Sequence, residues 1–485
     1  MVFKRLIRVG TLASAPQIFD FSTRFARTII LSRLLVPSEF GITVAIGVVV
    51  TIAELVGDLG VAKFLMSRPR EKDRAALAAA HLLHLVRGVG LAAILAAAAP
   101  WIATIFAAPD STAAFRWCAA IMLLRSVVHL GINQIQRDFR YGPEAAASVA
   151  ARFAALAVVF PAIALWHDYR AMIVSLLVDA AIYVGMSHRL AETRYSIVVR
   201  DRGILREMIA YGLPLTFNGM LWAANSQADR AIVSHFLGLE VLALYAVMLN
   251  LATVPVAMMY AILNLLGMSL LARAHTSPRL HAQSYIALVW LHAVTAAGFA
   301  LSVAALLDLL VPLIYGPAYV VSHIAQALIA LIVWMRINRG GPNAVMLFSS
   351  DTRPLLLGGS VLATGLILVI VLLPLLPRIE TVLAGLLVGE TLSLFFFLYA
   401  ARRQTIASSS AVVGHLAWSF APVIAACAAV VLFPPGGVWW RVAVLGIGGT
   451  ITGVQALAGL HFHLLRNGLL TGRGRETGPA PTGAQ

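Results

Sequence analysis

The sequence predicts an all-α, polytopic membrane protein with about 14 transmembrane helices. Hydrophobic residues make up 60% of the 485 residues, and charged residues only 12%. A soluble domain carries about 25% charged residues, so this chain has too few charges to cover the surface of a soluble protein of its size. The apolar residues also come in blocks of about 20 or more, which is the length that a helix needs to cross the hydrocarbon core of a bilayer.

The expected spans follow one another with short connections. The longest connections, 189–207 and 336–353, are about 20 residues each, which is too short for a folded domain. Nearly the whole chain is therefore expected within the membrane. In order, the spans are 11–33, 41–66, 76–106, 113–135, 145–166, 171–188, 208–235, 241–271, 284–315, 319–335, 354–376, 380–401, 411–433 and 440–464.

The basic residues indicate how the chain is oriented. If the N-terminus is cytoplasmic and the spans alternate, 24 of the 36 Lys and Arg lie in cytoplasmic connections and termini. The opposite side receives four: Arg33, Arg170, Arg378 and Arg441. Such an asymmetry is typical of cytoplasmic loops, so both termini are expected in the cytoplasm. The net charge of +15 is thus a topology signal, and its spread over separate loops argues against nucleic-acid binding.

An internal repeat groups the spans. When the chain is shifted by 202 residues, Ser32 falls on Ser234 and Leu35 on Leu237, and at a slightly larger shift residues 105–109 match residues 313–317. The first span then matches the seventh and the third matches the ninth, so the two halves have parallel topology. The expected organisation is an N-terminal six-helix lobe at 1–193, a C-terminal six-helix lobe at 194–405, two extra C-terminal helices at 406–465 and a disordered cytoplasmic tail at 466–485.

Eight basic residues remain inside or at the ends of spans, and all of them precede residue 231. A charge at the bilayer centre costs about 2.5–3.5 kcal/mol even on the mildest scale, so such residues usually face a bundle interior or a water-filled cavity. The first lobe is therefore expected to have a basic interior. The eight are Arg24, Arg27, Lys63, Arg87, Arg116, Arg125, Arg152 and Arg230.

A charged stripe on the first span is the leading candidate site. Asp20, Arg24 and Arg27 are spaced i, i+4 and i+7, so they share one helix face. Asp20 and Arg24 can pair along that face, which lowers the cost of burying Arg24 and leaves Arg27 for a ligand. The repeat matches this face to a neutral-to-acidic stripe on the seventh span, formed by Asn218, Trp222, Asn225 and Asp229.

Several short motifs, in order over roughly residues 5–400, carry a family resemblance. The chain resembles the polysaccharide transporter (oligosaccharide flippase, Wzx-like) family of the multidrug/oligosaccharidyl-lipid/polysaccharide exporter superfamily. It departs from the usual pattern at Ala243, where the family more often has glycine. The motifs are RLLVPSEFG at 33–41, GDLG at 57–60, QRDFRY at 136–141, YGLP at 211–214, DR at 229–230 with LY at 244–245, and LIYGPAY at 313–319.

The resemblance implies a function as well as a fold. It implies two lobes around a central cavity, with alternating access by a rocking motion. The implied substrate is an oligosaccharide on a polyprenyl diphosphate carrier, which moves from the cytoplasmic to the periplasmic leaflet of a bacterial inner membrane for exopolysaccharide or O-antigen-type synthesis. Membrane lipids, a polysaccharide polymerase and chain-length proteins are the implied partners, and neither a cofactor nor an enzymatic activity is expected.

On this interpretation, the intramembrane arginines bind the diphosphate, because planar guanidinium donors match phosphate oxygens bidentately. Arg24 and Arg27 are the first choice, helped by Arg87 and Arg125. The alternative is that Arg24 forms a structural lock with Asp20 and that Arg87, Arg125 and Arg152 have structural roles. Trp222 would stack on a sugar ring or simply pack, and Asn218 and Asn225 would bond sugar hydroxyls.

Other polar residues are assigned to pairing or coupling. Asp20, Glu54, Asp229 and Arg230 are expected to pair charges or couple transport. Acidic residues inside spans are candidate ion or proton sites, or are neutralised by a neighbour; they are Glu54, Asp179, Asp308 and Glu390. His81 and His84, at i and i+3, have no third ligand nearby, so no metal site is predicted.

Two other classes of protein compete with a flippase. A phosphate-binding loop of the Gly-x-x-x-x-Gly-Lys-Ser/Thr type is missing from the sequence, which argues against ATP-driven transport by this chain. An ion-coupled exporter of cationic drugs is disfavoured because Arg24 and Arg27 would repel a cation. A membrane polymerase or glycosyltransferase would be expected to place catalytic residues on a long extramembrane loop, and the connections here are short.

Overall fold

A computed structural model of the chain describes residues 19–57, 59–67, 73–138, 140–199, 201–274, 277–348, 353–433 and 438–459. In these residues the regular elements are all helices, which confirms the all-α prediction. The expected tail at 466–485 lies outside the described residues. Residues 19–34 are helical and are called the first helix below.

The remaining elements follow in chain order. They are α2 (Pro37–Val56), α3 (Val61–Ser67), α4 (Asp73–Ile105), η2 (Pro109–Ser111), α5 (Thr112–Arg125), α6 (Gly131–Gln134), η3 (Ile135–Asp138), α7 (Gly142–Trp166), α8 (Arg170–Leu190), α9 (Arg202–Leu237), α10 (Leu239–Ala274), α11 (Pro278–Tyr315), α12 (His323–Asn338), α13 (Gly340–Phe348), α14 (Arg353–Leu372), α15 (Ile379–Gln404), α16 (Ser409–Leu432) and α17 (Val438–Gly459).

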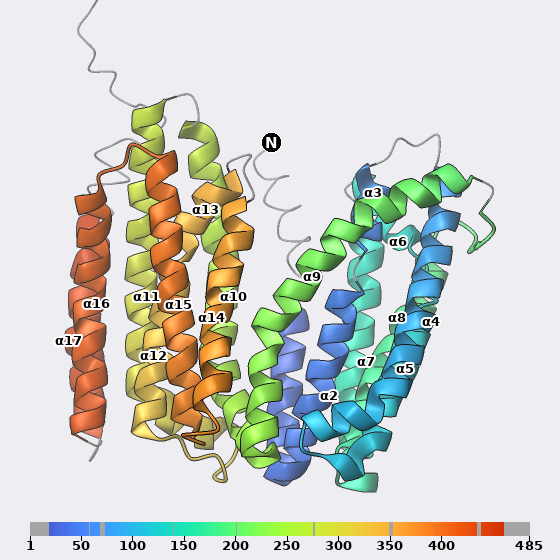
Figure 1. The fold of residues 1–485 in the computed structure, drawn as a ribbon, viewed down its shortest axis with the longest axis horizontal. Coiled ribbons are helices and arrows are strands. Elements are labelled where there is room, and N and C mark those ends of the chain that lie inside the picture. The colour runs from blue at the N-terminus through green and yellow to red at the C-terminus, as the bar shows by residue number, and fades with distance from the viewer. Residues whose placement is uncertain are drawn as a thin grey trace, which may run out of the picture. The chain divides into compact units, whose positions relative to one another are not determined.

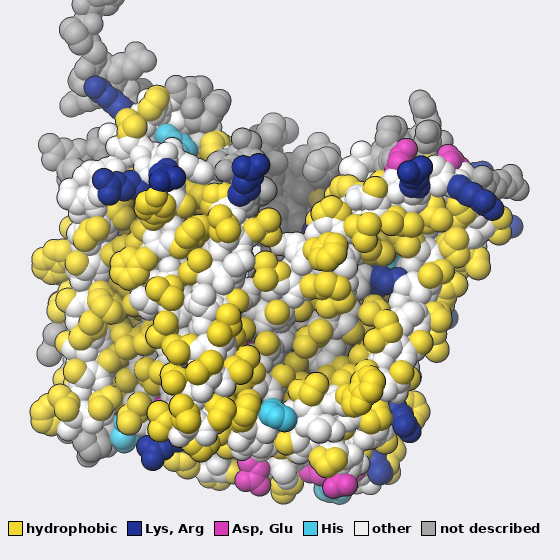
Figure 2. Space-filling view, in the orientation of Figure 1, with side chains coloured by type: hydrophobic (Ala, Val, Ile, Leu, Met, Phe, Trp, Pro, Cys, Tyr) yellow, Lys and Arg dark blue, Asp and Glu magenta, His cyan; other side chains and the backbone are white. Residues whose placement is uncertain are grey.

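Ten helices of the described residues are long and apolar enough to cross a membrane. The polytopic membrane class is therefore confirmed, whereas the count of 14 is not. The difference arises in part because α5 and α12 have only 14 and 16 residues, fewer than the roughly 20 that a full span needs. Figure 2 shows apolar side chains along the helices and most of the visible charged side chains near the helix ends, as a membrane protein requires.

Two expected spans are interrupted. The span at 41–66 is divided into α2 and α3, because the chain turns between Gly57 and Gly60. Gly60 has a φ of +61°, a left-handed conformation that glycine adopts without a steric penalty. The span at 113–135 ends as a regular helix at Arg125 and continues through a turn into the short α6. Asp58 lies outside the described residues.

The chain divides into two compact units. Unit 1 comprises residues 1–250, 311–320 and 372–379, and unit 2 comprises residues 251–310, 321–371 and 380–485. Unit 1 is a helical bundle in which α7 lies along α8 and α9 crosses α2 and α4 (Figure 1). Unit 1 therefore holds the first repeat together with the first helix of the second repeat.

Ion pairs between helices hold unit 2 together. Arg441 of α17 donates to both carboxylate oxygens of Asp308 on α11, each at 2.8 Å. On α15, Glu390 is only 1% exposed, and it accepts from Arg336 Nε at 2.7 Å and pairs with Arg339 Nη1 at 2.8 Å. Arginines thus neutralise both Asp308 and Glu390. This arrangement fits the prediction that a neighbour neutralises these acidic residues, rather than the prediction that they are ion or proton sites.

Candidate functional site

The first helix carries an ion pair that is part of a larger network. Asp20 Oδ2 lies 3.0 Å from Arg24 Nε, one helical turn further along. The other oxygen of the same carboxylate, Oδ1, lies 2.5 Å from Nε of Arg152 on α7. Asp20 therefore links its own helix to α7. Arg24, whose side chain is 45% exposed, shares the Asp20 carboxylate with Arg152.

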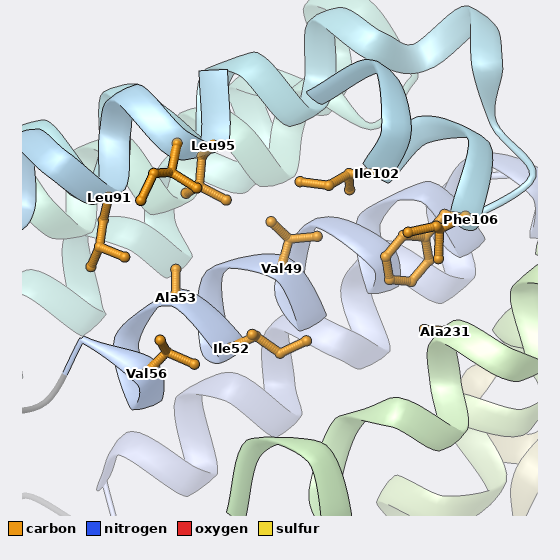
Figure 3. A pocket seen from close by; sticks show the side chains of 11 residues that line it. Val49, Ile52, Ala53, Val56, Leu91, Leu95, Ile102, Phe106 and Ala231 are labelled. Atoms are coloured by element: carbon orange, nitrogen blue, oxygen red, sulfur yellow. The ribbon is translucent and has the colours of Figure 1, made fainter. Parts of the chain in front are cut away.

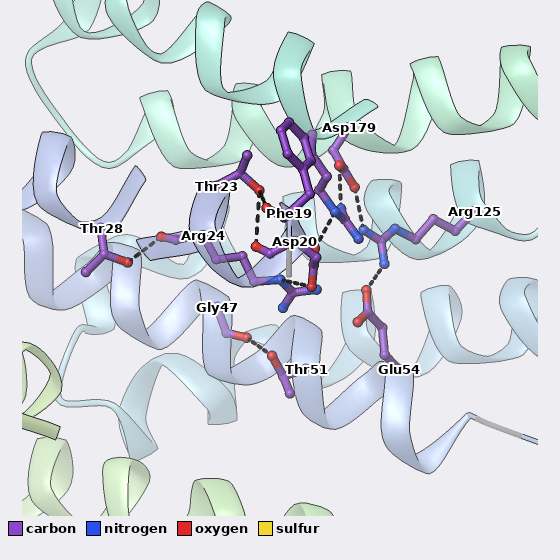
Figure 4. A network of polar contacts seen from close by, with 11 residues as sticks. Phe19, Asp20, Thr23, Arg24, Thr28, Gly47, Thr51, Glu54, Arg125 and Asp179 are labelled. Atoms are coloured by element: carbon purple, nitrogen blue, oxygen red, sulfur yellow. Dashed lines mark hydrogen bonds and ion pairs between the residues drawn. The ribbon is translucent and has the colours of Figure 1, made fainter. Parts of the chain in front are cut away.

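Asp179 on α8 is the centre of this network. It is 2% exposed, and its Oδ2 accepts from Arg125 Nη2 at 2.8 Å. Its Oδ1 accepts from Arg152 Nη1. Arg125, at the end of α5, pairs in addition with Glu54 of α2. Figure 4 shows Arg125 lying between Asp179 and Glu54, with Asp20 and Arg24 beside them. A continuous charged network thus runs through the first helix, α2, α5, α7 and α8.

Among the described side chains that ion pairs and hydrogen bonds join, the network has more cations than anions; Glu144, on α7, interacts with Arg152 at longer range and is not counted. It contains three carboxylates, those of Asp20, Glu54 and Asp179, and four guanidinium groups, those of Arg24, Arg27, Arg125 and Arg152. Arg27 donates from Nη1 to the hydroxyl of Ser175 on α8 at 3.2 Å. Among the described residues no carboxylate lies within ion-pair distance of Arg27. The formal excess of one positive charge therefore resides at Arg27 and the half-exposed Arg24, and it favours an anionic ligand.

Arg87 is placed differently from the other predicted arginines. Its Nη1 donates to the carbonyl of Gly57, at the point where α2 ends. A cation at a helix C-terminus interacts favourably with the unpaired carbonyl groups there. The structure therefore brings Arg24, Arg27 and Arg125 into one network, and gives Arg87 a contact with the end of α2.

The second predicted stripe lies on α9. Asn218 and Trp222 are exposed, with Trp222 at 58%, and Asn225 is half-buried. Asp229 is buried and accepts from the hydroxyl of Tyr245 on α10 at 2.5 Å.

Arg230, next to Asp229, stays on its own helix. Its Nη1 donates to the Ser226 carbonyl at 2.7 Å and to Gln227 Oε1 at 3.1 Å. The Asp229 end of the α9 stripe thus bonds to a neighbouring helix, whereas the side chains at the Asn218–Trp222 end are exposed.

An apolar cavity of about 340 Å³ lies between α2, α4 and α9. Every side chain that lines it is apolar, including Val49, Ile52, Leu95 and Phe106, which Figure 3 shows around the same gap. Without a donor or acceptor, this cavity has nothing to hold a diphosphate or a sugar. The charged network, rather than the cavity, is therefore the candidate site for a polar ligand.

A metal centre is not found in the part of the chain that the structure describes, where no group of three or more His, Cys, Asp or Glu side chains could hold a metal ion. His81 and His84 bond to backbone carbonyl oxygens instead, those of Ser196 and Arg125, each at 3.1 Å.

Comparison with known families identifies the chain. A family described as polysaccharide biosynthesis protein matches residues 30–324, which is more than half of the sequence. The chain belongs to this family. The match confirms the predicted resemblance to a family of polysaccharide synthesis. No curated protein matches the sequence.

Solved structures share the fold of this family member. A structure described as lipid II flippase MurJ in an inward closed conformation matches with a TM-score of 0.69 and 9% identity, over 92% of this chain and 99% of that one. A MATE transporter in a bent conformation matches with a TM-score of 0.54 and 12% identity, over 85% and 96%. An inward-facing multidrug resistance MATE transporter matches with a TM-score of 0.52 and 13% identity, over 86% and 98%. At these identities the matches establish the fold.

Arg152, Asp179 and Ser175 belong to the network as well. The sequence suggests a structural role for Arg152 and an ion site or a neutralised charge for Asp179, and it does not single out Ser175. A signal existed, because Arg152 and Asp179 are charges inside spans, and Ser175 precedes Asp179 by one helical turn. Their partners lie on other helices, so only the tertiary structure reveals that they contact Arg27, Arg125 and Asp20.

Proposed function

We propose that this protein is a flippase that moves an oligosaccharide linked to polyprenyl diphosphate from the cytoplasmic to the periplasmic leaflet of a bacterial inner membrane. Membership of the polysaccharide biosynthesis family supports a role in glycan synthesis. The fold is that of transporters, one of which is a flippase of lipid II. A transporter rather than an enzyme is the function that fits this family and this fold together.

One observation carries the proposal: the charged network contains one guanidinium more than it has carboxylates. Arg125 and Arg152 pair with the buried carboxylate of Asp179, whereas Arg27, among the described residues, donates to the neutral hydroxyl of Ser175 and has no carboxylate within ion-pair distance. A diphosphate has close to two negative charges and oxygen atoms that accept from guanidinium groups in pairs. We assign Arg24 and Arg27 to the diphosphate, and Arg125 to a supporting positive charge.

The remaining site assignments extend this proposal to the glycan. The exposed ring of Trp222 offers a flat apolar surface for one face of a sugar, and the amide groups of Asn218 and Asn225 would bond to hydroxyl groups. Two lobes, at 1–193 and 194–405, would then alternate access to a cleft between them. Both termini would lie in the cytoplasm, and a polymerase and chain-length proteins would act on the exported product.

Export of surface polysaccharide tests the role of the two arginines. The double variant Arg24→Ala/Arg27→Ala should abolish export in a strain that lacks the native protein, while its level in the membrane stays normal. Arg170→Ala is the matched control, because this arginine is 57% exposed and pairs with Asp168 outside the network. Normal export by the double variant would exclude the diphosphate role.

A transport assay tests the substrate class. Purified protein in liposomes should move a labelled polyprenyl-diphosphate sugar between leaflets and should leave small organic cations in place. Movement of cations without movement of the lipid-linked sugar would show a drug exporter instead, and the proposal would fall.

A further inference from the structure

Three histidines and a tyrosine form a cluster beside the connection between α8 and α9. The rings of His81, on α4, and Tyr195, in the connection, are stacked with centroids 4.2 Å apart. The His129 ring, after α5, lies 4.7 Å from His81, and the His188 ring, on α8, lies 5.3 Å from His129. His81 and His129 are each only 1% exposed. Four separate segments of unit 1 thus meet at one aromatic cluster.

Hydrogen bonds assign a single neutral form to each buried imidazole. His81 Nε2 accepts from the backbone N–H of Leu130 at 3.1 Å, so the proton must be on Nδ1, which donates to the Ser196 carbonyl at 3.1 Å. His129 Nδ1 accepts from the N–H of Gly131 at 3.1 Å, so its proton is on Nε2, which donates to the Thr193 carbonyl at 2.9 Å. Both imidazoles therefore use one nitrogen to hold the connection and the other to accept a backbone donor.

These bonds tie the connection to the bundle. Thr193 and Ser196 are held through their carbonyl oxygens, and Tyr195 through its stacked ring. Val199 packs against a core that includes Leu77 and Ala80 of α4. The connection joins the last helix of the first repeat to the first helix of the second repeat, so its attachment constrains how α9 can move against α4.

Protonation would break this arrangement. A proton on His81 Nε2 or on His129 Nδ1 would set an N–H group directly against a backbone N–H group, and it would place two cations in adjacent rings. In the described part of the chain, neither imidazole pairs with a carboxylate that could stabilise the cation.

The other titratable groups around the cluster do not compensate for a new positive charge. His84 donates from Nε2 to the Arg125 carbonyl, and the exposed His188 would itself become a cation. Burial raises the pKa of Tyr195, so its hydroxyl stays neutral. Glu192, in the connection, is already paired with Arg140 at 2.7 Å.

We propose that the His81–His129 pair is an acid-sensitive anchor, which releases the connection between α8 and α9 when both imidazoles are protonated. Histidine titrates near pH 6.5 when it is free. The anchored form excludes the proton and the released form binds it, so the anchored form is stable above that pH and is lost as the pH falls below it. Each histidine changes the ratio of released to anchored protein by up to about tenfold per pH unit. The two histidines together change this ratio by up to about a hundredfold per pH unit.

A spin label in the connection measures the release. Val198 is 67% exposed, and the native cysteines, Cys118 and Cys427, are buried, so a label on Val198→Cys reports on this segment alone. We expect the label to be immobile at pH 8 and mobile at pH 5, reversibly, with a midpoint below about 6.5 and a transition steeper than that of one proton. A label on Val413→Cys, on α16, is the control for unfolding by acid and should not respond.

Histidine variants complete the test. Glutamine keeps a donor and an acceptor but does not titrate in this range, so His81→Gln/His129→Gln should remove the transition. His235→Gln, which changes an exposed histidine on α9, should retain it. The proposal is overturned if the label on Val198→Cys does not respond to pH in the protein with native histidines, a result that needs no histidine variant to fold. A transition that persists in the double variant would also overturn it.

Discussion

Replacing Asp179 with asparagine should destabilise unit 1 strongly. The carboxylate is 2% exposed and accepts from both Arg125 and Arg152. In Asp179→Asn, one oxygen becomes an amide N–H₂ group that faces a guanidinium donor. The formal excess of positive charge in the network would increase from one to two, inside a bundle where charges are poorly solvated.

The magnitude follows from what remains around each arginine. Removing one partner of a buried ion pair costs about 3–5 kcal/mol. Arg125 keeps Glu54 and Arg152 keeps Asp20, so we expect a loss near the lower limit, about 3 kcal/mol in the free energy of unfolding. The control is Glu192→Gln, whose ion pair with Arg140 has both side chains more than half exposed, and which should cost about 0.2–1 kcal/mol.

Denaturant unfolding of the purified protein in mixed micelles measures both variants against the native chain. A double variant, Asp179→Asn/Arg152→Gln, should recover part of the loss, because it removes the cation that has lost its partner. The reasoning fails if Asp179→Asn is no more destabilising than Glu192→Gln, or if the second substitution adds its full cost.

Two further predictions concern packing in unit 1. A Cβ on Gly41 would lie 2.2 Å from the Leu239 carbonyl oxygen, whereas one on Gly47, on the same helix, would meet nothing closer than 3.7 Å. The gain in helix propensity is the same at both positions, so the difference between the two variants reports the close contact. Thermal unfolding should show Gly41→Ala to be less stable than Gly47→Ala by about 1–3 kcal/mol. Equal stability would contradict the close contact. Tyr245→Phe should cost about 1.5–3 kcal/mol in denaturant unfolding, because Asp229 loses a buried charged hydrogen bond, and a cost below that of a surface change would contradict it.

The sequence predicted the fold class because hydropathy reports directly on burial in a membrane. The interruptions in two spans could not be read in the same way. Residues 57–60 and the turn after Arg125 lie inside the expected spans 41–66 and 113–135, and an average over the roughly 20 residues of a span does not show where a helix stops within it. Gly60 has a left-handed backbone, and a Cβ there would lie 2.2 Å from Leu215 Cδ1 on α9, a close approach that only the tertiary structure reveals.

The candidate site could be predicted only where it is local. The Asp20–Arg24 pair follows from a spacing of four residues on one helix. The contacts of Arg152 and Asp179 join helices that are distant in sequence, and a single sequence contains no pattern that pairs them. Arg87 is also a charge within an expected span, and the sequence does not show that it donates to the carbonyl at the end of α2.

The sequence repeat has a counterpart in the contacts of unit 1. Phe106, at the end of α4, and Ile314, at the end of α11, are equivalent residues in the matched segments 105–109 and 313–317. The Phe106 carbonyl accepts from the Ser234 hydroxyl at the end of α9, and the Ile314 carbonyl accepts from Arg33 Nε at the end of the first helix, each at 2.7 Å. Each repeat thus caps a helix of the other, which explains why residues 311–320 cluster with unit 1. The two acceptors are equivalent in the repeat, but the donors are one residue out of register, because Ser234 matches Ser32 rather than Arg33.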